Sequence, residues 1–409
     1  MATSNVSLSV NRNRERVWTT MGRACGLALV AMMPLIAQAE PTQQPANPYV
    51  KWQRGPSKDA TFFPIAVWLQ HPKNATRFQE LGFNLYVGLW QGPTTGQLAQ
   101  LKNNGMPVIC AQNDVGLTDK NSDVIVGWLH GDEPDNAQSL GKGKGYGPPV
   151  EPDRIVTDYR TLAKADPSRP ILLNLGQGVA WDGWHGRGVR TNHPEDYPEY
   201  LEGCDIASFD IYPAVHDKPE VAGKLEFVAR GVDRLREWGK EQRIVWNCIE
   251  CTRIGNVHVK PTPAQVRSEV WMSLIHGSQG LIYFVHQFKP TFVEAGLLAD
   301  AEMAKAVGEI NRQIGELAPV LNSPVLVEAV SVTSSNAQVP IDIMVKRYKE
   351  TTYVFAVAMR NHPTTATFKC KQATAAKAEV LGEDRSIELV EGGFSDAFAP
   401  YAVHLYRLR

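Results

Sequence analysis

Eight short apolar runs, each bounded by turn residues, recur along this chain with helix-like segments between them. The runs lie at 63–69, 83–89, 107–111, 124–129, 171–175, 205–212, 243–249 and 280–285. Their hydrophobicity is continuous rather than alternating, as expected for parallel strands that are buried on both faces. Helix-like segments at 74–81, 96–103, 152–165, 218–239 and 262–276 separate them, and several of these begin at a proline or a capping residue.

Eight strand/helix units over about 260 residues are the usual size of a closed parallel (β/α)8 barrel. A doubly wound open sheet is the alternative, but no glycine-rich nucleotide turn follows the first strand. The segment 141–149 superficially resembles a phosphate loop, yet no Ser or Thr follows its lysines. The sequence therefore predicts an α/β fold built on a TIM barrel, with 141–149 as a loop after the fourth strand.

The pattern changes period after a helix expected at 300–317. Short alternating runs follow at 325–333, 341–348, 352–359, 367–371, 378–381, 386–389 and 402–408. Alternation of this kind predicts antiparallel strands with one buried face. We therefore predict a catalytic barrel at 61–320 and a small C-terminal antiparallel β-sandwich at 321–409.

The first 39 residues resemble a secretory signal peptide. Four arginines precede an apolar run at 26–36, which ends in Ala37-Gln38-Ala39. The run is shorter than the roughly 20 residues needed to span a bilayer, which argues against an uncleaved membrane anchor. The sequence predicts a signal peptide at 1–39, a secreted or periplasmic protein, and an extended lead-in at 40–60.

Composition narrows the possible partners. The 409 residues are 43% hydrophobic, enough for a large core, and their net charge of -1 gives no basic footprint for nucleic acid or anionic membrane. Five of the six cysteines lie beyond the signal, an odd number that does not suggest a disulfide framework. Cys248 and Cys251 have redox spacing but should face opposite sides of a strand. No cofactor is expected, and the oligomeric state is left open.

In a parallel barrel, catalytic groups sit at the C-terminal ends of the strands. The residues at the predicted strand exits are rich in amides and aromatic rings, which suit the hydroxyl groups and C–H faces of sugars. The candidates for substrate binding are Trp90, Asn113, Asp132, Asn174, Gln177, Trp181, Trp184, Asp210, Tyr212 and His286.

Two of the strand-like runs end in glutamate. Glu133 follows the fourth run in the turn Asp132-Glu133-Pro134, and Glu250 closes the seventh, Val-Trp-x-x-x-Glu at 245–250. Glycosidic bonds are commonly cleaved by two carboxyl groups brought together from distant parts of a sequence. Glu133 could instead belong to a first helical turn, and Glu250 could pair with Arg253, so the hypothesis depends on both residues lying at one face of the barrel.

These motifs make the chain similar to the large clan of retaining (β/α)8 glycoside hydrolases with catalytic glutamates on strands four and seven. Strand six (205–213) and strand eight (280–284) also resemble members of that clan, so the likeness covers roughly residues 60–320. The resemblance implies that Glu133 is the acid/base, Glu250 the nucleophile, and Tyr212 a hydrogen-bond partner of the nucleophile. It further implies a poly- or oligosaccharide substrate, with a β-linkage favoured.

The chain departs from that clan at Asp132, where the clan has asparagine. A second carboxylate beside Glu133 would raise the proton affinity of one of them, which helps a general acid. It also leaves open that Asp132 itself is the proton donor. The rival functions are a non-catalytic carbohydrate-binding protein on a degenerate barrel, and a hydrolase with a metal held by Asp132, Asp210 and His286. The histidines lack metal-ligand spacing, so no metal is expected.

Overall fold

The computed structural model describes residues 47–371 and 375–409. The predicted signal peptide and residues 40–46 of the lead-in lie outside these ranges, so the signal peptide stays a prediction. Within them, no helix is long and apolar enough to cross a membrane.

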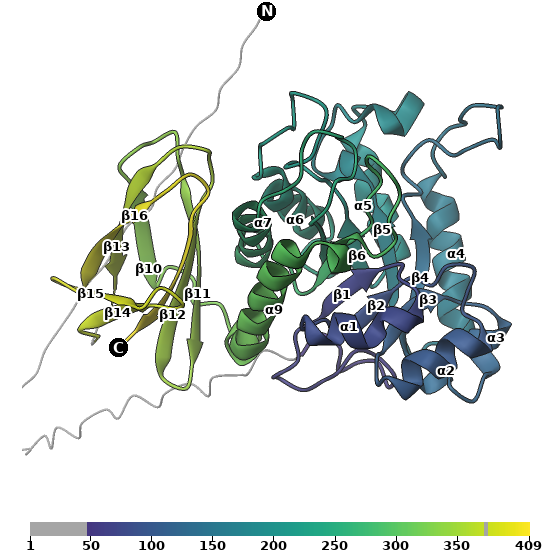
Figure 1. Cartoon of the computed structure of the whole chain (residues 1–409), viewed down its shortest axis with the longest axis horizontal. Coiled ribbons are helices and arrows are strands. Elements are labelled where there is room, and N and C mark those ends of the chain that lie inside the picture. Colours follow the sequence, from purple (N-terminus) through teal and green to yellow (C-terminus); the bar gives the residue numbers. More distant parts are fainter. Residues whose placement is uncertain (1–46, 372–374) are drawn as a thin grey trace, which may run out of the picture. The chain divides into compact units, whose positions relative to one another are not determined.

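A parallel sheet of nine segments forms the barrel, and it confirms the predicted fold class (Figure 1). Its order is β7-β6-β5-β4-β3-β2-β1-β9-β8, and every pairing is parallel. The seventh barrel strand is divided at Trp246 into β7 and β8, which pair with β6 and β9 on either side and so join the two ends of the sheet. The segments are β1 (Ile65–Trp68), β2 (Leu85–Val87), β3 (Val108–Ala111), β4 (Ile125–Asp132), β5 (Ile171–Leu175), β6 (Ile206–Phe209), β7 (Ile244–Val245), β8 (Asn247–Glu250) and β9 (Leu281–Phe284).

Alternate side chains of the strands fill two separate apolar clusters. One set, including Ala66, Leu85, Ile109 and Leu172, packs together inside the barrel. The opposite set packs against the surrounding helices. Burial on both faces explains why the sequence shows continuous apolar runs. The helices are α1 (Ala75–Glu80), α2 (Thr95–Asn103), α3 (Asp114–Thr118), α4 (Pro152–Ala165), α5 (Tyr197–Tyr200), α6 (Phe227–Trp238), α7 (Pro263–Ile275), α8 (Gly296–Ala299) and α9 (Ala301–Leu321).

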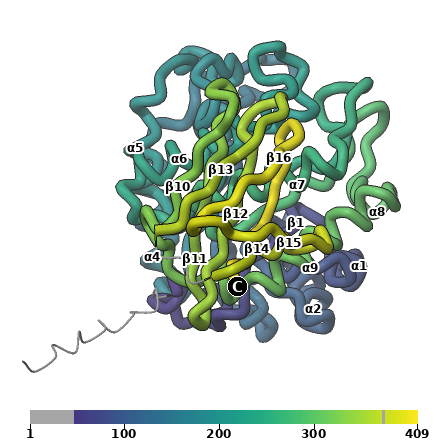
Figure 2. Tube along the Cα trace, turned by 90° about the vertical axis from the view of Figure 1, so that its left-hand side faces the viewer, coloured from purple at the N-terminus to yellow at the C-terminus, as the bar shows by residue number. Residues whose placement is uncertain are grey.

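Two antiparallel sheets follow α9, as the change of period predicts. One has the order β10-β13-β16 and the other β11-β12-β17-β14-β15, and Figure 2 shows their strands running side by side. The strand β16 was not expected, because its sequence Gly-Phe-Ser-Asp-Ala-Phe is rich in turn residues. The strands are β10 (Val330–Ser334), β11 (Ile341–Tyr348), β12 (Thr351–Ala358), β13 (Thr364–Cys370), β14 (Lys377–Val380), β15 (Arg385–Glu388), β16 (Gly393–Phe398) and β17 (Val403–Leu408).

Helix α7 joins the barrel to the second of these sheets. The ring of Trp271 on α7 lies 5.2 Å from that of Phe355 on β12. Ser268 Oγ donates a hydrogen bond to the carbonyl of Tyr401 at 2.7 Å, and the Tyr401 hydroxyl reaches Glu226 next to α6. An apolar contact with buried polar bonds at its edge predicts that the sandwich and the barrel unfold together.

His276, at the end of α7, also bridges the two parts. Its ring nitrogens lie 2.9 Å from Asp233 on α6 and 3.2 Å from Asp342 on β11. Burial alone would lower the pKa of His276, but the bonds to the two carboxylates raise it to about 9.

A raised histidine pKa means that the bridge stabilises the fold fully below about pH 6.5 and loses this effect as pH rises through 9. Because both carboxylates are half exposed, we expect a contribution of about 2 kcal/mol. Urea unfolding of the wild type at pH 6 and pH 10 measures this contribution as a fall in the free energy of unfolding between the two pH values. In His276→Gln the fall should be smaller by about 2 kcal/mol. An equal loss in both proteins would contradict the bridge.

Candidate active site

The acidic turn after β4 has an unusual backbone. Asp132 ends the strand with its side chain exposed at the barrel mouth, and Glu133 follows with a positive φ of 47°. The Glu133 N–H donates to the carbonyl of Asn174 on β5 at 2.9 Å. A non-glycine residue in the left-handed region is strained, and such residues cluster at functional sites. Glu133 is therefore not part of a helical first turn.

Glu133 shares a hydrogen bond with Asp210, which follows β6. The backbone N–H of Asp210 donates to the Leu175 carbonyl at 3.1 Å, and the residue is only 8% exposed. Burial and the nearby charge of Asp132 raise the pKa of Glu133 to about 7. Burial and the charge of Glu133 raise the pKa of Asp210 well above its usual value. Two carboxyl groups in contact cannot both ionise easily, so the pair holds one proton near neutral pH.

Asn174 fixes the orientation of the acidic groups around it. Its Nδ2 donates to Asp132 Oδ1 at 3.0 Å and lies 3.5 Å from Asp210 Oδ1, while its Oδ1 accepts from Ser208 Oγ at 2.8 Å. The serine therefore sets which way the buried amide points. As a result, three strand ends, those of β4, β5 and β6, contribute to one polar cluster.

Glu250 lies elsewhere. The residue has no exposed surface, and its carboxylate oxygens accept the backbone N–H groups of Ala214 and Val215 at 2.6 and 3.0 Å. It also hydrogen bonds to Glu269 on α7, and burial raises the pKa of Glu250 to about 8. Glu250 therefore holds the loop after β6, and Arg253 is not its partner.

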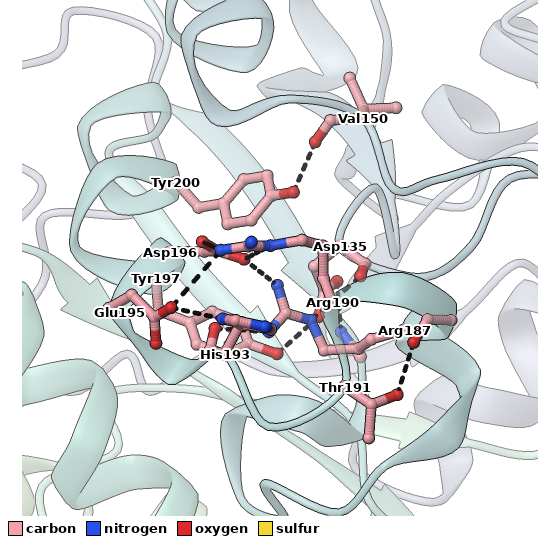
Figure 3. Close-up of polar contacts among 12 residues, drawn as sticks. Asp135, Val150, Arg187, Arg190, Thr191, His193, Glu195, Asp196, Tyr197 and Tyr200 are labelled. Atoms are coloured by element: carbon pink, nitrogen blue, oxygen red, sulfur yellow. Dashed lines mark hydrogen bonds and ion pairs between the residues drawn. The ribbon is translucent and has the colours of Figure 1, made fainter.

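A buried network supports the loops beyond Glu133 (Figure 3). Asp135 accepts hydrogen bonds from the Gly176 N–H at 2.9 Å and from the Tyr197 hydroxyl at 2.8 Å. Arg187, 1% exposed, donates to the Asp135 carbonyl and to Asp196 Oδ2, the latter at 2.7 Å. These bonds tie the turn after β4 to the long loop after β5. The network keeps the strained turn in place and excludes water from behind it.

A cavity of ≈ 250 Å³ lies among the loops after β5, β6 and β8, and neither Glu133 nor Asp210 lines it. Tyr212, two residues after Asp210, lines it together with Trp184, Gln177 and His216. Trp181 lies 6.0 Å from Trp184 between ring centres, and Trp184 Nε1 donates to Asn136 Oδ1 at 2.8 Å. The cavity thus offers indole and phenol faces beside amide and imidazole groups and the charged Asp217 and Lys218, which is a suitable lining for a polar ligand.

Three candidates from the sequence lie apart from this cluster. Asn113 caps α3 by accepting the Gly116 N–H at 2.8 Å, and its Nδ2 donates to the Pro93 carbonyl, so both ends of its amide are engaged. Trp90 is 70% exposed on the loop after β2. His286, after β9, is buried 3.2 Å from Gln70 Nε2. The structure thus gives Asn113 a structural role and brings together the residues from β4, β5 and β6.

Several residues of the site were not found from the sequence. Asp135, Asn136 and Ser208 have ordinary sequence surroundings, and only the acidic run 132–135 offered a signal. His216 bonds to Gln177 Oε1 at 2.8 Å, but it lies in a loop without a motif. The pairing of Glu250 with Glu269 joins a strand to a helix, which no local pattern encodes.

In the described residues, no group of three or more His, Cys, Asp or Glu side chains could hold a metal ion. In particular, the buried His286 hydrogen bonds with Gln70 rather than with Asp132 or Asp210. The thiols of Cys248 and Cys251 lie near Asn174 Oδ1 and the Phe284 carbonyl respectively, and burial raises the pKa of both well above the usual value. They therefore face different surroundings and remain protonated.

No protein-family model and no curated protein sequence matches this chain. Solved structures do match its fold. A candidate alpha-galactosidase/melibiase from Bacteroides fragilis aligns with a TM-score of 0.54 and 9% identity, covering 86% of this chain and 80% of that protein. A second candidate alpha-galactosidase from the same organism aligns with a TM-score of 0.51 and 10% identity, covering 85% and 79%. The chain therefore shares a barrel fold with these proteins.

Proposed function

We propose that this protein is a glycoside hydrolase whose reacting carboxyl groups are Glu133 and Asp210. The observation that carries the proposal is the hydrogen bond between them at the C-terminal ends of β4 and β6, where burial and neighbouring carboxylates raise the pKa of both groups. A protonated carboxyl beside an ionised one is the combination that glycosidic cleavage requires. The position of the two residues also supports the proposal, because enzymes with this fold have their active sites at the C-terminal ends of the barrel strands.

Glu133 is assigned as the general acid and base, since it is the more accessible of the two and its pKa of about 7 suits proton transfer near neutral pH. In the free protein their hydrogen bond lowers the pKa of Glu133 and raises that of Asp210, so the step requires the shared proton to pass to Glu133 when the substrate binds. Glu133 then protonates the leaving oxygen while the ionised Asp210 attacks the anomeric carbon. Water, deprotonated by Glu133, afterwards releases the sugar from Asp210. A retaining pair stands about 5–5.5 Å apart and an inverting pair about 6.5–9.5 Å. Glu133 and Asp210 are in contact, which is nearer to the retaining arrangement, and the substrate must separate them as it binds.

Asp210 is preferred over Glu250 as the nucleophile because a nucleophile must touch the substrate. Glu250 is fully buried, and both its oxygens already accept hydrogen bonds. The role for Glu250 inferred from the resemblance stays a prediction, and the two assignments lead to different expected results for the same variants. Asp132, held by Asn174 at the mouth, is assigned to binding a sugar hydroxyl.

The proton on Glu133 predicts how the rate depends on pH. With a pKa of about 7, the general acid is protonated below that value, so kcat/KM should fall about tenfold per pH unit above it. A pH profile of glycoside hydrolysis measures the fall. A profile that stays flat from pH 6 to pH 9 would contradict the assignment of Glu133.

Hydrolysis of a glycan panel by the wild type, compared with Glu133→Gln, tests the proposed function. The panel begins with galactosides, because the two Bacteroides fragilis structures described above are named as candidate alpha-galactosidases, and includes α- and β-linked substrates. We expect the wild type to release sugar from at least one substrate and the variant to be inactive. Binding of a glycan by both proteins without release would instead support the rival, a carbohydrate-binding protein.

Export is part of the proposal, resting on the basic and apolar residues of the first 39 positions. Mass spectrometry of the protein from the periplasm or medium should give a mature chain that begins near Glu40. A chain that keeps residues 1–39 in the cytoplasm would contradict it.

A further inference from the structure

The loop after β9 is closed and held rigidly at the barrel mouth. Gln287 and Val293 exchange backbone hydrogen bonds of 3.0 and 2.8 Å across it. The Phe288 N–H also donates to the Arg253 carbonyl at 2.9 Å, which fastens the loop to the one after β8. Such a loop pays little entropy when a ligand binds, because its conformation is already fixed.

Phe288 and Phe292 project from this loop and are 45% and 61% exposed. The Phe292 ring is nearly parallel to that of His286, at 17° and 5.9 Å between centres. The Phe288 ring is similarly aligned with Phe284, at 27° and 5.9 Å. We call these four residues the β9-loop aromatic cluster. The Phe288 and Phe292 rings are 5.5 Å apart between centres and so form one small contiguous apolar patch rather than two scattered exposed residues.

The β9-loop aromatic cluster is continuous with the candidate active site. The ring of Phe284 lies 5.3 Å from that of Tyr212, which is two residues after Asp210, and the charges of Asp210 and Glu133 raise the pKa of Tyr212. A row of rings therefore runs from Tyr212 through Phe284 to Phe288 and Phe292. A ligand at the carboxyl pair that extends along this row would meet apolar faces.

The size of the exposed surface distinguishes between possible occupants. Two half-exposed phenyl rings offer roughly 200 Å² of apolar surface. A stable protein interface needs about 800 Å² from each partner, so neither a second copy nor another protein is well matched. One or two pyranose rings, whose C–H faces are flat and whose hydroxyls stay in water, do match it.

We propose that the β9-loop aromatic cluster binds sugar units of the substrate beyond the bond that is cleaved, so that the substrate is an oligo- or polysaccharide. This inference rests on the proposed function. The outer sugar units lie over Phe288 and Phe292, while the reacting unit lies at Glu133 and Asp210.

Kinetics with substrates of different length test the inference. The double variant Phe288→Ala/Phe292→Ala is compared with the wild type on an aryl monoglycoside and on oligosaccharides of the same sugar. We expect KM for the longest oligosaccharide to rise about tenfold, with kcat little changed and the monoglycoside unaffected. The variant Phe288→Ala/Phe292→Trp should bring the KM back toward the wild-type value, because tryptophan supplies an aromatic face again. Tyr146→Ala, which removes an exposed ring from the loop after β4, is the control and should not reproduce the effect.

Each outcome is decisive. Equal KM values for wild type and double variant on every chain length would overturn the inference while leaving the hydrolase intact. A change in sedimentation of the double variant would show that a second copy covers the rings, which also overturns it. If the wild type cleaves no glycoside at all, the proposed function fails first.

Discussion

Replacing Glu133 with glutamine should lower kcat for glycoside hydrolysis by about 10³-fold or more, because the leaving oxygen loses its proton donor. Asp210→Asn should lower it at least as much, since an amide cannot attack the anomeric carbon. The two losses should not add, because the residues act as one unit through a shared proton. Initial rates of the two single variants and the double variant measure this.

Both substitutions keep the side-chain shape, so folding should survive. They also remove a carboxyl group from a buried cluster of like charges, and we therefore expect unchanged or slightly raised thermal stability. Glu309→Gln, on the exposed surface of α9, is the matched control and should retain full activity. Wild-type rates in Glu133→Gln or Asp210→Asn would refute the assignment of that residue.

Replacing Glu250 should have the second large effect, and that effect should be a loss of stability. Glu250→Ala leaves the buried N–H groups of Ala214 and Val215 without an acceptor, which should lower the free energy of unfolding by about 3 kcal/mol. Loosening that loop should also reduce activity, because Asp210 and Tyr212 precede it. Urea unfolding together with kcat and KM measures both consequences.

Glu250→Gln separates positioning from catalysis. Glutamine keeps one acceptor oxygen for the loop and can still hydrogen bond with Glu269, so we expect it to recover most of the stability and at least a tenth of the wild-type rate. If Glu250 were the nucleophile, Glu250→Gln would instead lower kcat by about 10³-fold or more while the protein stayed folded. That second result would return the nucleophile to Glu250.

The barrel was predictable because its strands are buried on both faces and its helices begin with local signals such as the capping boxes at Thr94 and Thr262. The seventh strand was expected to be continuous, yet Trp246 divides it. Strand β16 was missed because its pairing with β13, rather than its own residues, makes it a strand. Boundaries and pairings of this kind depend on distant contacts, which a local pattern does not contain.

The site was predictable only in part. The sequence indicated the strand exits, and Glu133, Asn174, Asp210 and Tyr212 do gather there. It gave no information on which way Glu250 points, since that depends on the N–H groups after β6 and on Glu269 of α7. Nor could it show that Asn113 serves as a helix cap. The contact between Glu133 and Asp210 joins residues 77 positions apart, so only the closed barrel shows it.

Azide rescue of the glycine variants tests the pair most directly. In Asp210→Gly, azide can occupy the space of the missing carboxylate and attack the anomeric carbon, and we predict restored turnover with a glycosyl azide of inverted configuration. Glu133→Gly should give a glycosyl azide of retained configuration, formed from the sugar bound to Asp210. Rescue with inversion in Glu250→Gly, with Asp210→Gly unresponsive, would contradict the account.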